Sequence, residues 1–208
     1  SGSLWFLALA ARCGVPIQQA QWSSCAVHLG KSSGHDGAIG YCLGYNGGQD
    51  AHARSAQTLL GLCVADKQVT LRRSIGNYLA SSPYSIREAH AYSAPSVLAT
   101  FLALHMHDEK ECRRQFALWS WYFTLAEQPD HSAAYIGGKR NNGGDEYLGR
   151  PHIMNAAVGV VLGAPKRRLF MYGGMPAIPG VAPGSLSPQL YKLVNGINKE
   201  KPAQTLKQ

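Results

Sequence analysis

The chain has 208 residues, of which 45% are hydrophobic, and this is enough for one compact core followed by a tail. Lysine and arginine outnumber aspartate and glutamate by 20 to 12, and the net charge of +8 favours anionic partners. The basic residues occur only in short pairs and triplets, so the sequence predicts no nucleic-acid interface. Five widely spaced cysteines without a C-x-x-C pair argue against a disulfide scaffold.

In chain order, the first predicted element is an apolar helix over residues 4–11, which ends in the segment 12–16 with its glycine and proline. It is too short to cross a bilayer, which needs about 20 apolar residues, so the sequence predicts no membrane span. Residues 68–80 are predicted to form a polar outer helix. Residues 109–128, with charged first turns and an aromatic body, are predicted to form another.

One junction is repeated three times along the chain, at His52, His90 and His152. In each copy a Gly-rich or polar loop leads to the histidine near the start of an apolar helix. The first two copies share Ala-His-Ala-x-Ser-Ala at residues 51–56 and 89–94, and the third keeps the histidine and an Ala-rich start. Because these helices are apolar nearly all round, they are predicted to be buried. The sequence therefore predicts an all-α fold of hairpins that each pair a buried helix with a more polar one.

Strand signals are sparse, and only residues 133–136 and 169–172 could form one small β-hairpin beside the helices. Beyond residue 172 the chain becomes rich in proline and glycine. We therefore divide it into a helical domain over residues 4–172 and a second region over residues 173–208, which comprises a crossing segment, a short helix and a polar tail.

Two segments resemble the α/α toroids of the terpenoid cyclase and protein prenyltransferase superfamily. Residues 34–41, Gly-His-Asp-Gly-Ala-Ile-Gly-Tyr, are similar to the Gly/aromatic turns of that group, and residues 54–62, Arg-Ser-Ala-Gln-Thr-Leu-Leu-Gly-Leu, to its inner-helix starts. The pattern also resembles toroid domains of unknown function in large, often exported, bacterial proteins. The resemblance covers about residues 4–172. It implies an α/α toroid or partial toroid that belongs to a longer parent chain, and leaves the compartment open, with an exported bacterial protein as one option.

The sequence predicts no metal and no cofactor. A zinc site like that of the prenyltransferases would need a cysteine two positions after an aspartate, whereas Gly37 and Ala38 follow Asp36. Histidines on neighbouring helices would also be about 8 to 10 Å apart, which is too far for Zn–N bonds of about 2 Å.

Candidate catalytic residues are the acids of the Gly-rich loops, Asp36 and Glu146, with His35 as a partner. A carboxylate on a loop at a concave end could act as a general acid or base. The competing interpretation is that an aspartate beside glycine closes a turn or caps a helix.

Candidate ligand-binding residues gather at the same helix starts, where backbone N–H groups and the helix dipole favour anions. The histidines could instead be helix-end or buried core residues, and the glycines could serve only tight turns. The candidates are His52, Arg54, His90, Asp145, Arg150, His152 and Tyr41.

Two functions follow from these residues. The first is a non-catalytic toroid-like module of a larger protein, which binds an unknown partner or an anionic or glycan ligand at its Gly-rich loop end. The alternative is a hydrolase- or lyase-like enzyme acting on a glycan or other polymer, with Asp36 or Glu146 as acid or base and Arg150 as an anion clamp. The sequence has no G-x-S-x-G, H-E-x-x-H or P-loop motif, and this favours the module.

Overall fold

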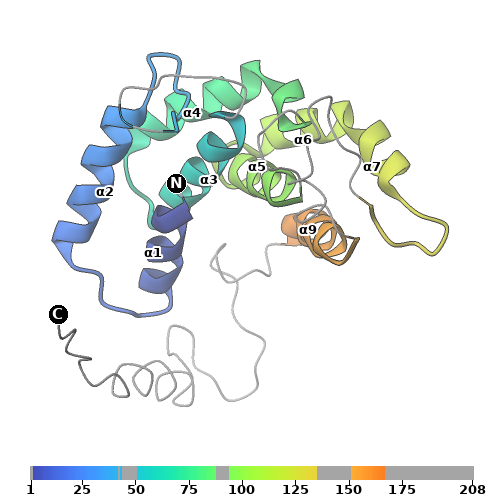
Figure 1. The fold of residues 1–208 in the computed structure, drawn as a ribbon, viewed down its shortest axis with the longest axis horizontal. Helices are drawn as coiled ribbons and strands as arrows, with labels where there is room; N and C mark the ends of the chain where they lie inside the picture. The colour runs from blue at the N-terminus through green and yellow to red at the C-terminus, as the bar shows by residue number, and fades with distance from the viewer. Residues whose placement is uncertain (1, 42, 44–50, 88–93, 135–150, 167–208) are drawn as a thin grey trace, which may run out of the picture.

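A computed structural model describes residues 2–41, 43, 51–87, 94–134 and 151–166 (Figure 1). Within these ranges the chain forms eight α-helices, two short 3-10 helices and no strand, which confirms the all-α prediction. The α-helices are α1 (Gly2–Arg12), α2 (Gln19–Ser32), α3 (Ala51–Ala65), α4 (Val69–Ser81), α5 (Ala94–His107), α6 (Glu109–Leu118), α7 (Ser120–Ala126) and α9 (Pro151–Gly163). The 3-10 helices are η1 (Pro83–Arg87) and η2 (Ala164–Lys166).

The helices form an inner row and an outer row. In the inner row α1 packs against α3, α3 against α5, and α5 against α9. On the outer side α4 packs on α3 and α5, and α6 packs on α5. Figure 1 shows α2, α4, α6 and α7 arranged as an arch around α1, α3, α5 and α9. The described residues therefore form an arc of alternating inner and outer helices.

The inner helices differ in how completely they are buried. Most residues of α3 and α5 are buried and the others are half-buried, as expected from their apolar character. In α9, Met154, Ala157 and Val161 are buried, whereas Asn155 and Leu162 are exposed. The prediction that this third helix is enclosed is therefore wrong for the described residues. Among the inner helices in these ranges, α5 is the one that packs against it, and α5 covers one of its sides.

The predicted helix over residues 109–128 is divided into α6 and α7 at Trp119. Asp108 caps the start of α6 by accepting the N–H groups of Lys110 and Glu111. At Trp119 the backbone leaves the helical region, with φ −97° and ψ 5°. The indole is almost fully buried and donates its N–H to the carbonyl of Pro83, 3.0 Å away. This tertiary contact accompanies the break, and no helix-breaking residue in the sequence marks it.

The opening helix and the outer helix near residues 68–80 are present as α1 and α4, whereas α2 was not predicted. Of the proposed β-hairpin, Ala133 instead forms an isolated bridge with Glu127, and residues 135–136 and 169–172 lie outside the described ranges, as does the region 173–208. In the part of the chain that the structure describes, no helix has the length and apolar character needed to cross a membrane.

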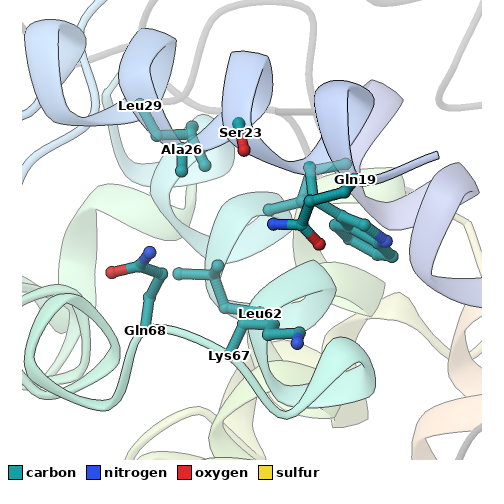
Figure 2. A pocket seen from close by; sticks show the side chains of 9 residues that line it. Gln19, Ser23, Ala26, Leu29, Leu62, Lys67 and Gln68 are labelled. Atoms are coloured by element: carbon teal, nitrogen blue, oxygen red, sulfur yellow. The ribbon is translucent and has the colours of Figure 1, made fainter. Parts of the chain in front are cut away.

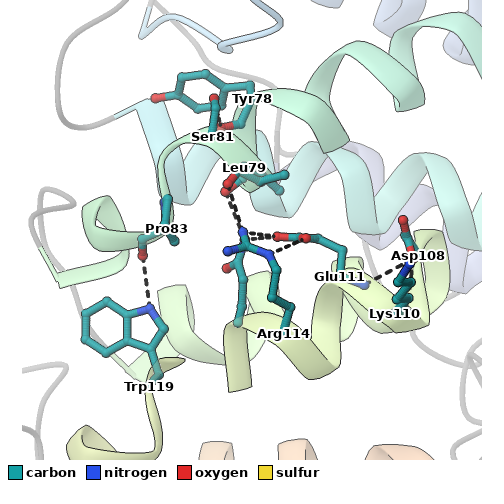
Figure 3. A network of polar contacts seen from close by, with 11 residues as sticks. Tyr78, Leu79, Ser81, Pro83, Asp108, Lys110, Glu111, Arg114 and Trp119 are labelled. Carbon is teal, nitrogen blue, oxygen red and sulfur yellow. Dashed lines mark hydrogen bonds and ion pairs between the residues drawn. The ribbon is translucent and has the colours of Figure 1, made fainter. Parts of the chain in front are cut away.

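Side chains of α6 cap the end of α4 (Figure 3). The last carbonyls of a helix have no partner within it. Gln115 donates its amide N–H to the carbonyl of Leu79 at 3.0 Å, and Arg114 donates to the carbonyl of Ala80 at 3.1 Å. Glu111 holds the Arg114 guanidinium through two contacts of 2.7 Å, and this hydrogen bonding lowers the pKa of the Glu111 carboxyl. The two outer helices are thereby joined through one buried hydrogen bond, from Gln115, and one exposed hydrogen bond, from Arg114.

We expect Gln115→Leu to lower the free energy of unfolding by about 1 to 3 kcal/mol, because it removes the partner of a carbonyl in the protein interior. The matched control is Arg113→Leu on the same helix, whose ion pair with Glu109 is largely exposed. For that variant we expect a change within about 0.5 kcal/mol. Guanidinium unfolding of both variants measures the difference, and equal losses would contradict the role given to Gln115.

Candidate functional site

The predicted catalytic residues His35 and Asp36 lie in a tight turn over residues 33–39, here called the first Asp turn. The Gly34 N–H donates to the carbonyl of Ala38 at 2.8 Å, and the Ala38 N–H donates to Asp36 Oδ1 at 3.0 Å. Gly37 has φ +90°, a conformation that side chains other than glycine rarely adopt. One oxygen of Asp36 therefore closes the turn, which was the competing interpretation of this aspartate.

The first Asp turn is fixed to the start of α3. The N–H of Ile39 donates to the hydroxyl of Ser55 at 2.9 Å, and this bond is buried. Arg54 donates its Nε–H to the carbonyl of Ile39 at 3.3 Å, and its guanidinium lies 5.2 Å from the ring centre of Tyr41. The turn thus places Tyr41 and Arg54 together, with the Tyr41 side chain 72% exposed.

A second Asp turn, residues 127–133, is built in the same way. The Gln128 N–H donates to the carbonyl of Ser132 at 2.8 Å, and the Ser132 N–H donates to Asp130 Oδ1 at 3.0 Å. These hydrogen bonds to Ser132 lower the pKa of the Asp130 carboxyl. His131, with φ +62°, takes the place that Gly37 has in the first turn.

The second turn is attached to α9 as the first is to α3. The N–H of Ala133 donates to the Asn155 side-chain oxygen, as the N–H of Ile39 donates to Ser55. Asn155 and Ser55 are each the fifth residue of their helix. The structure therefore contains two copies of one unit, in which an Asp turn is hydrogen-bonded to the following inner helix.

Sequence analysis missed the second turn, although a signal was present. The spacing from Asp130 to Tyr135 equals the spacing from Asp36 to Tyr41, and a small residue follows each aspartate at the second position. The repeat found at His52 and His152 thus begins earlier, at the turns.

The matched histidines do not share one environment. His52, the second residue of α3, is 0% exposed and lies 6.5 Å from the ring of Tyr78. Neither of its ring nitrogens has a hydrogen-bond partner in the described structure. Burial lowers the pKa of His52 to about 4, so the ring is neutral near pH 7. His152, the second residue of α9, is exposed, as is His35.

Several predicted site residues converge near α3. Burial raises the pKa of the Tyr78 hydroxyl, the charge of Asp36 raises it further, and the charge of Arg54 opposes this. The charges of Asp36 and Arg54 thus both act on Tyr78, whose ring lies 6.5 Å from that of His52. His90, Asp145, Glu146 and Arg150 lie outside the described residues.

Cavities occur elsewhere in the fold. One of about 160 Å³ lies between α1, α2 and α3 and is lined by Trp22, Leu62 and Lys67 among others (Figure 2). Typical ligand sites occupy about 300 to 1,000 Å³, so this cavity is small for one. A cavity of about 380 Å³ borders the second Asp turn, where Glu127 Oε1 lies 3.0 Å from His131 Nδ1. Both members of this pair are exposed.

Within the ranges that the structure describes, no group of three or more histidine, cysteine, aspartate or glutamate side chains is placed to hold a metal ion. Comparison of the chain with protein-family models, with curated proteins and with solved structures finds no match. The interpretation of the site therefore depends on its own geometry.

We expect Gly37→Ala to destabilise the protein by more than about 1 kcal/mol, because the added Cβ would lie 2.2 Å from the carbonyl oxygen of Ser74 and the residue has a positive φ. The matched control is Gly30→Ala in α2, where an added Cβ has nothing within 4 Å. There we expect unchanged or slightly higher stability, since alanine favours helix by about 1 kcal/mol. Thermal unfolding of both variants checks this, and equal melting temperatures would contradict it.

The burial of His52 also gives a pH dependence. Because its folded-state pKa of about 4 is below the usual 6.5, the unfolded chain binds the proton more tightly. The contribution of His52 to the free energy of unfolding is fully present above about pH 6.5 and is lost as the pH falls towards 4. Its total is about 3 kcal/mol. We expect His52→Phe to flatten the stability profile over this range. His35→Phe, at an exposed position, should retain the wild-type profile in denaturant unfolding. A His52→Phe profile as steep as wild type would refute the assignment.

Proposed function

We propose that this protein is a non-catalytic binding module, part of an α/α toroid or partial toroid, which binds its ligand at the loop end formed by the first Asp turn and the start of α3. The observation that carries the proposal is the pair of equivalent Asp turns. Each is hydrogen-bonded to the fifth residue of an inner helix, and each leaves its aspartate and a histidine exposed. Such fixed turns present side chains on a rigid support, as binding loops require.

The ligand class that fits best is an acidic polysaccharide. Tyr41 offers an exposed ring that can pack against a sugar, and Arg54 lies beside it as a cation. His35 and Asp36 are exposed nearby on the same turn and can exchange hydrogen bonds with sugar hydroxyls. The net charge of +8 assists the approach of a polyanion.

The alternative is a hydrolase- or lyase-like enzyme that acts on such a polymer. It requires Asp36 and Glu146, with a histidine, to reach one point on the substrate. One carboxylate oxygen of Asp36 already accepts a hydrogen bond within its own turn, so the geometry favours a structural role for Asp36 over a catalytic one.

The test compares binding of alginate, an acidic polysaccharide, with binding of neutral dextran by isothermal titration calorimetry. We expect alginate to bind, dextran to bind more weakly, and Tyr41→Ala to weaken alginate binding by about tenfold, equivalent to about 1.4 kcal/mol. The matched control is Tyr84→Ala, since Tyr84 is 64% exposed but lies on η1.

Three results would decide against this proposal. Failure to bind alginate would remove the ligand class, and equal effects of the two tyrosine variants would remove the site. Release of new reducing ends or unsaturated sugars during incubation, lost in Asp36→Asn, would favour the enzyme instead.

A further inference from the structure

A second cavity of ligand size lies between α5, α6 and α9. Its volume is about 410 Å³, within the range of small-molecule sites. It is lined by residues of α5, α6, α9 and η2 and is partly open to solvent. The wall is mainly apolar and includes Phe101, Cys112, Phe116, Val161, Ala164 and Pro165.

The aromatic part of the wall is held by ring packing. Phe101 and Phe116 meet edge to face at 5.7 Å, and Phe116 stacks on Phe123 at 5.0 Å with planes 19° apart. Phe101 is almost fully buried, so this part of the wall is fixed by the core. A planar ring entering the cavity would find phenyl side chains already positioned.

The polar groups at the cavity are an ion pair, a thiol and the buried imidazole of His105. Glu109 and Arg113, which both line it, form an ion pair of 2.5 Å. The Cys112 thiol donates to the carbonyl of Phe101 at 3.5 Å. Burial raises the pKa of this thiol to about 11, so it is uncharged near pH 7. An ionic ligand would have to disrupt the ion pair or lose its hydration without compensation.

We propose that the cavity between α5, α6 and α9 is a binding site for an uncharged, mainly aromatic small molecule, of a size comparable to two or three fused or linked rings. Its apolar body lies against Phe101, Phe116 and Val161, and any single polar substituent points towards the Glu109–Arg113 pair. The site is independent of the loop end at α3, because it uses different residues and the opposite kind of chemistry.

The cavity has an exposed small residue that permits a clean test. Ala117 lines the cavity from α6 and is exposed, so a large side chain can be placed there without altering the core. Ala117→Trp is expected to obstruct the cavity. Ala20→Trp is the matched control, because Ala20 is an exposed alanine on α2, away from the cavity lining.

The probe is N-phenyl-1-naphthylamine, an uncharged aromatic amine whose fluorescence rises in apolar surroundings, titrated into the full 208-residue chain. We expect saturable binding of one molecule per chain, at least about tenfold weaker binding in Ala117→Trp, and wild-type binding in Ala20→Trp. The sulfonated analogue, 1-anilinonaphthalene-8-sulfonate, should bind several-fold more weakly, since it adds a charge to the same ring system. Unchanged melting temperatures show that both variants fold.

Other outcomes overturn the proposal. Absence of saturable binding would exclude an aromatic site. Equal binding by wild type and Ala117→Trp would place the probe elsewhere, and tighter binding of the sulfonate would indicate attraction to the basic surface rather than occupation of a neutral cavity. If Ala117→Trp fails to fold, Leu162→Trp on the α9 side, where Leu162 is exposed and lines the same cavity, replaces it under the same criteria.

Discussion

The burial of α3 between α1 and α5 is the constraint on which the rest of the structure depends. A helix covered on both sides leaves little room for side chains and no water for its polar groups. At Gly61 an added Cβ would lie 3.0 Å from the backbone nitrogen of Trp5, so α1 and α3 approach closely there. The buried hydroxyl of Ser55 accepts a hydrogen bond from the N–H of Ile39, and the buried imidazole of His52 remains uncharged. The same burial therefore fixes both the first Asp turn and the protonation state of the repeat histidine.

Hydrogen bonds from side chains to backbone groups join one helix to the next. Arg12 at the end of α1 donates to the carbonyl of Val64 at the end of α3, and Gln115 of α6 does the same for Leu79 of α4. Each satisfies a terminal carbonyl that its own helix cannot. The described ion pairs, by contrast, each involve at least one largely exposed side chain, where a pair contributes about 1 kcal/mol or less. The hairpins are thus connected by capping between helices and by apolar packing.

The sequence predicted what depends on local pattern, and it did not predict what depends on tertiary contact. The all-round apolar character of α3 and α5 predicted their burial, because a helix with no polar face has no side to turn to water. The break at Trp119 was missed because its indole is anchored to Pro83, which lies on a distant part of the chain. The helix α2 was missed because it is poor in apolar residues and mostly exposed.

The candidate site shows the same division. In the sequence, Asp36 beside glycine supported both a catalytic and a turn interpretation. Only the structure shows that Asp36 accepts a hydrogen bond from the N–H of Ala38. His52 and His152 occupy the same position in the repeat, but one is buried and the other exposed. Their difference arises because α3 has inner neighbours on two sides, whereas in the described residues α9 has one, α5. Position within a repeat therefore identifies equivalent residues without specifying equivalent surroundings.

The two proposed sites follow from two different parts of a helical hairpin. Helix ends carry turns with exposed polar groups, so the loop end at α3 suits a charged, hydroxyl-rich polymer. The space between helix flanks is lined by side chains that face the core, so the cavity at α6 suits an uncharged aromatic body. The element common to both is α5, which packs on α3 and supplies Phe101 to the cavity wall. Coupling between the sites would therefore require a displacement of α5, and its nearly complete burial makes such a displacement costly. Occupation of one site should leave the affinity of the other unchanged.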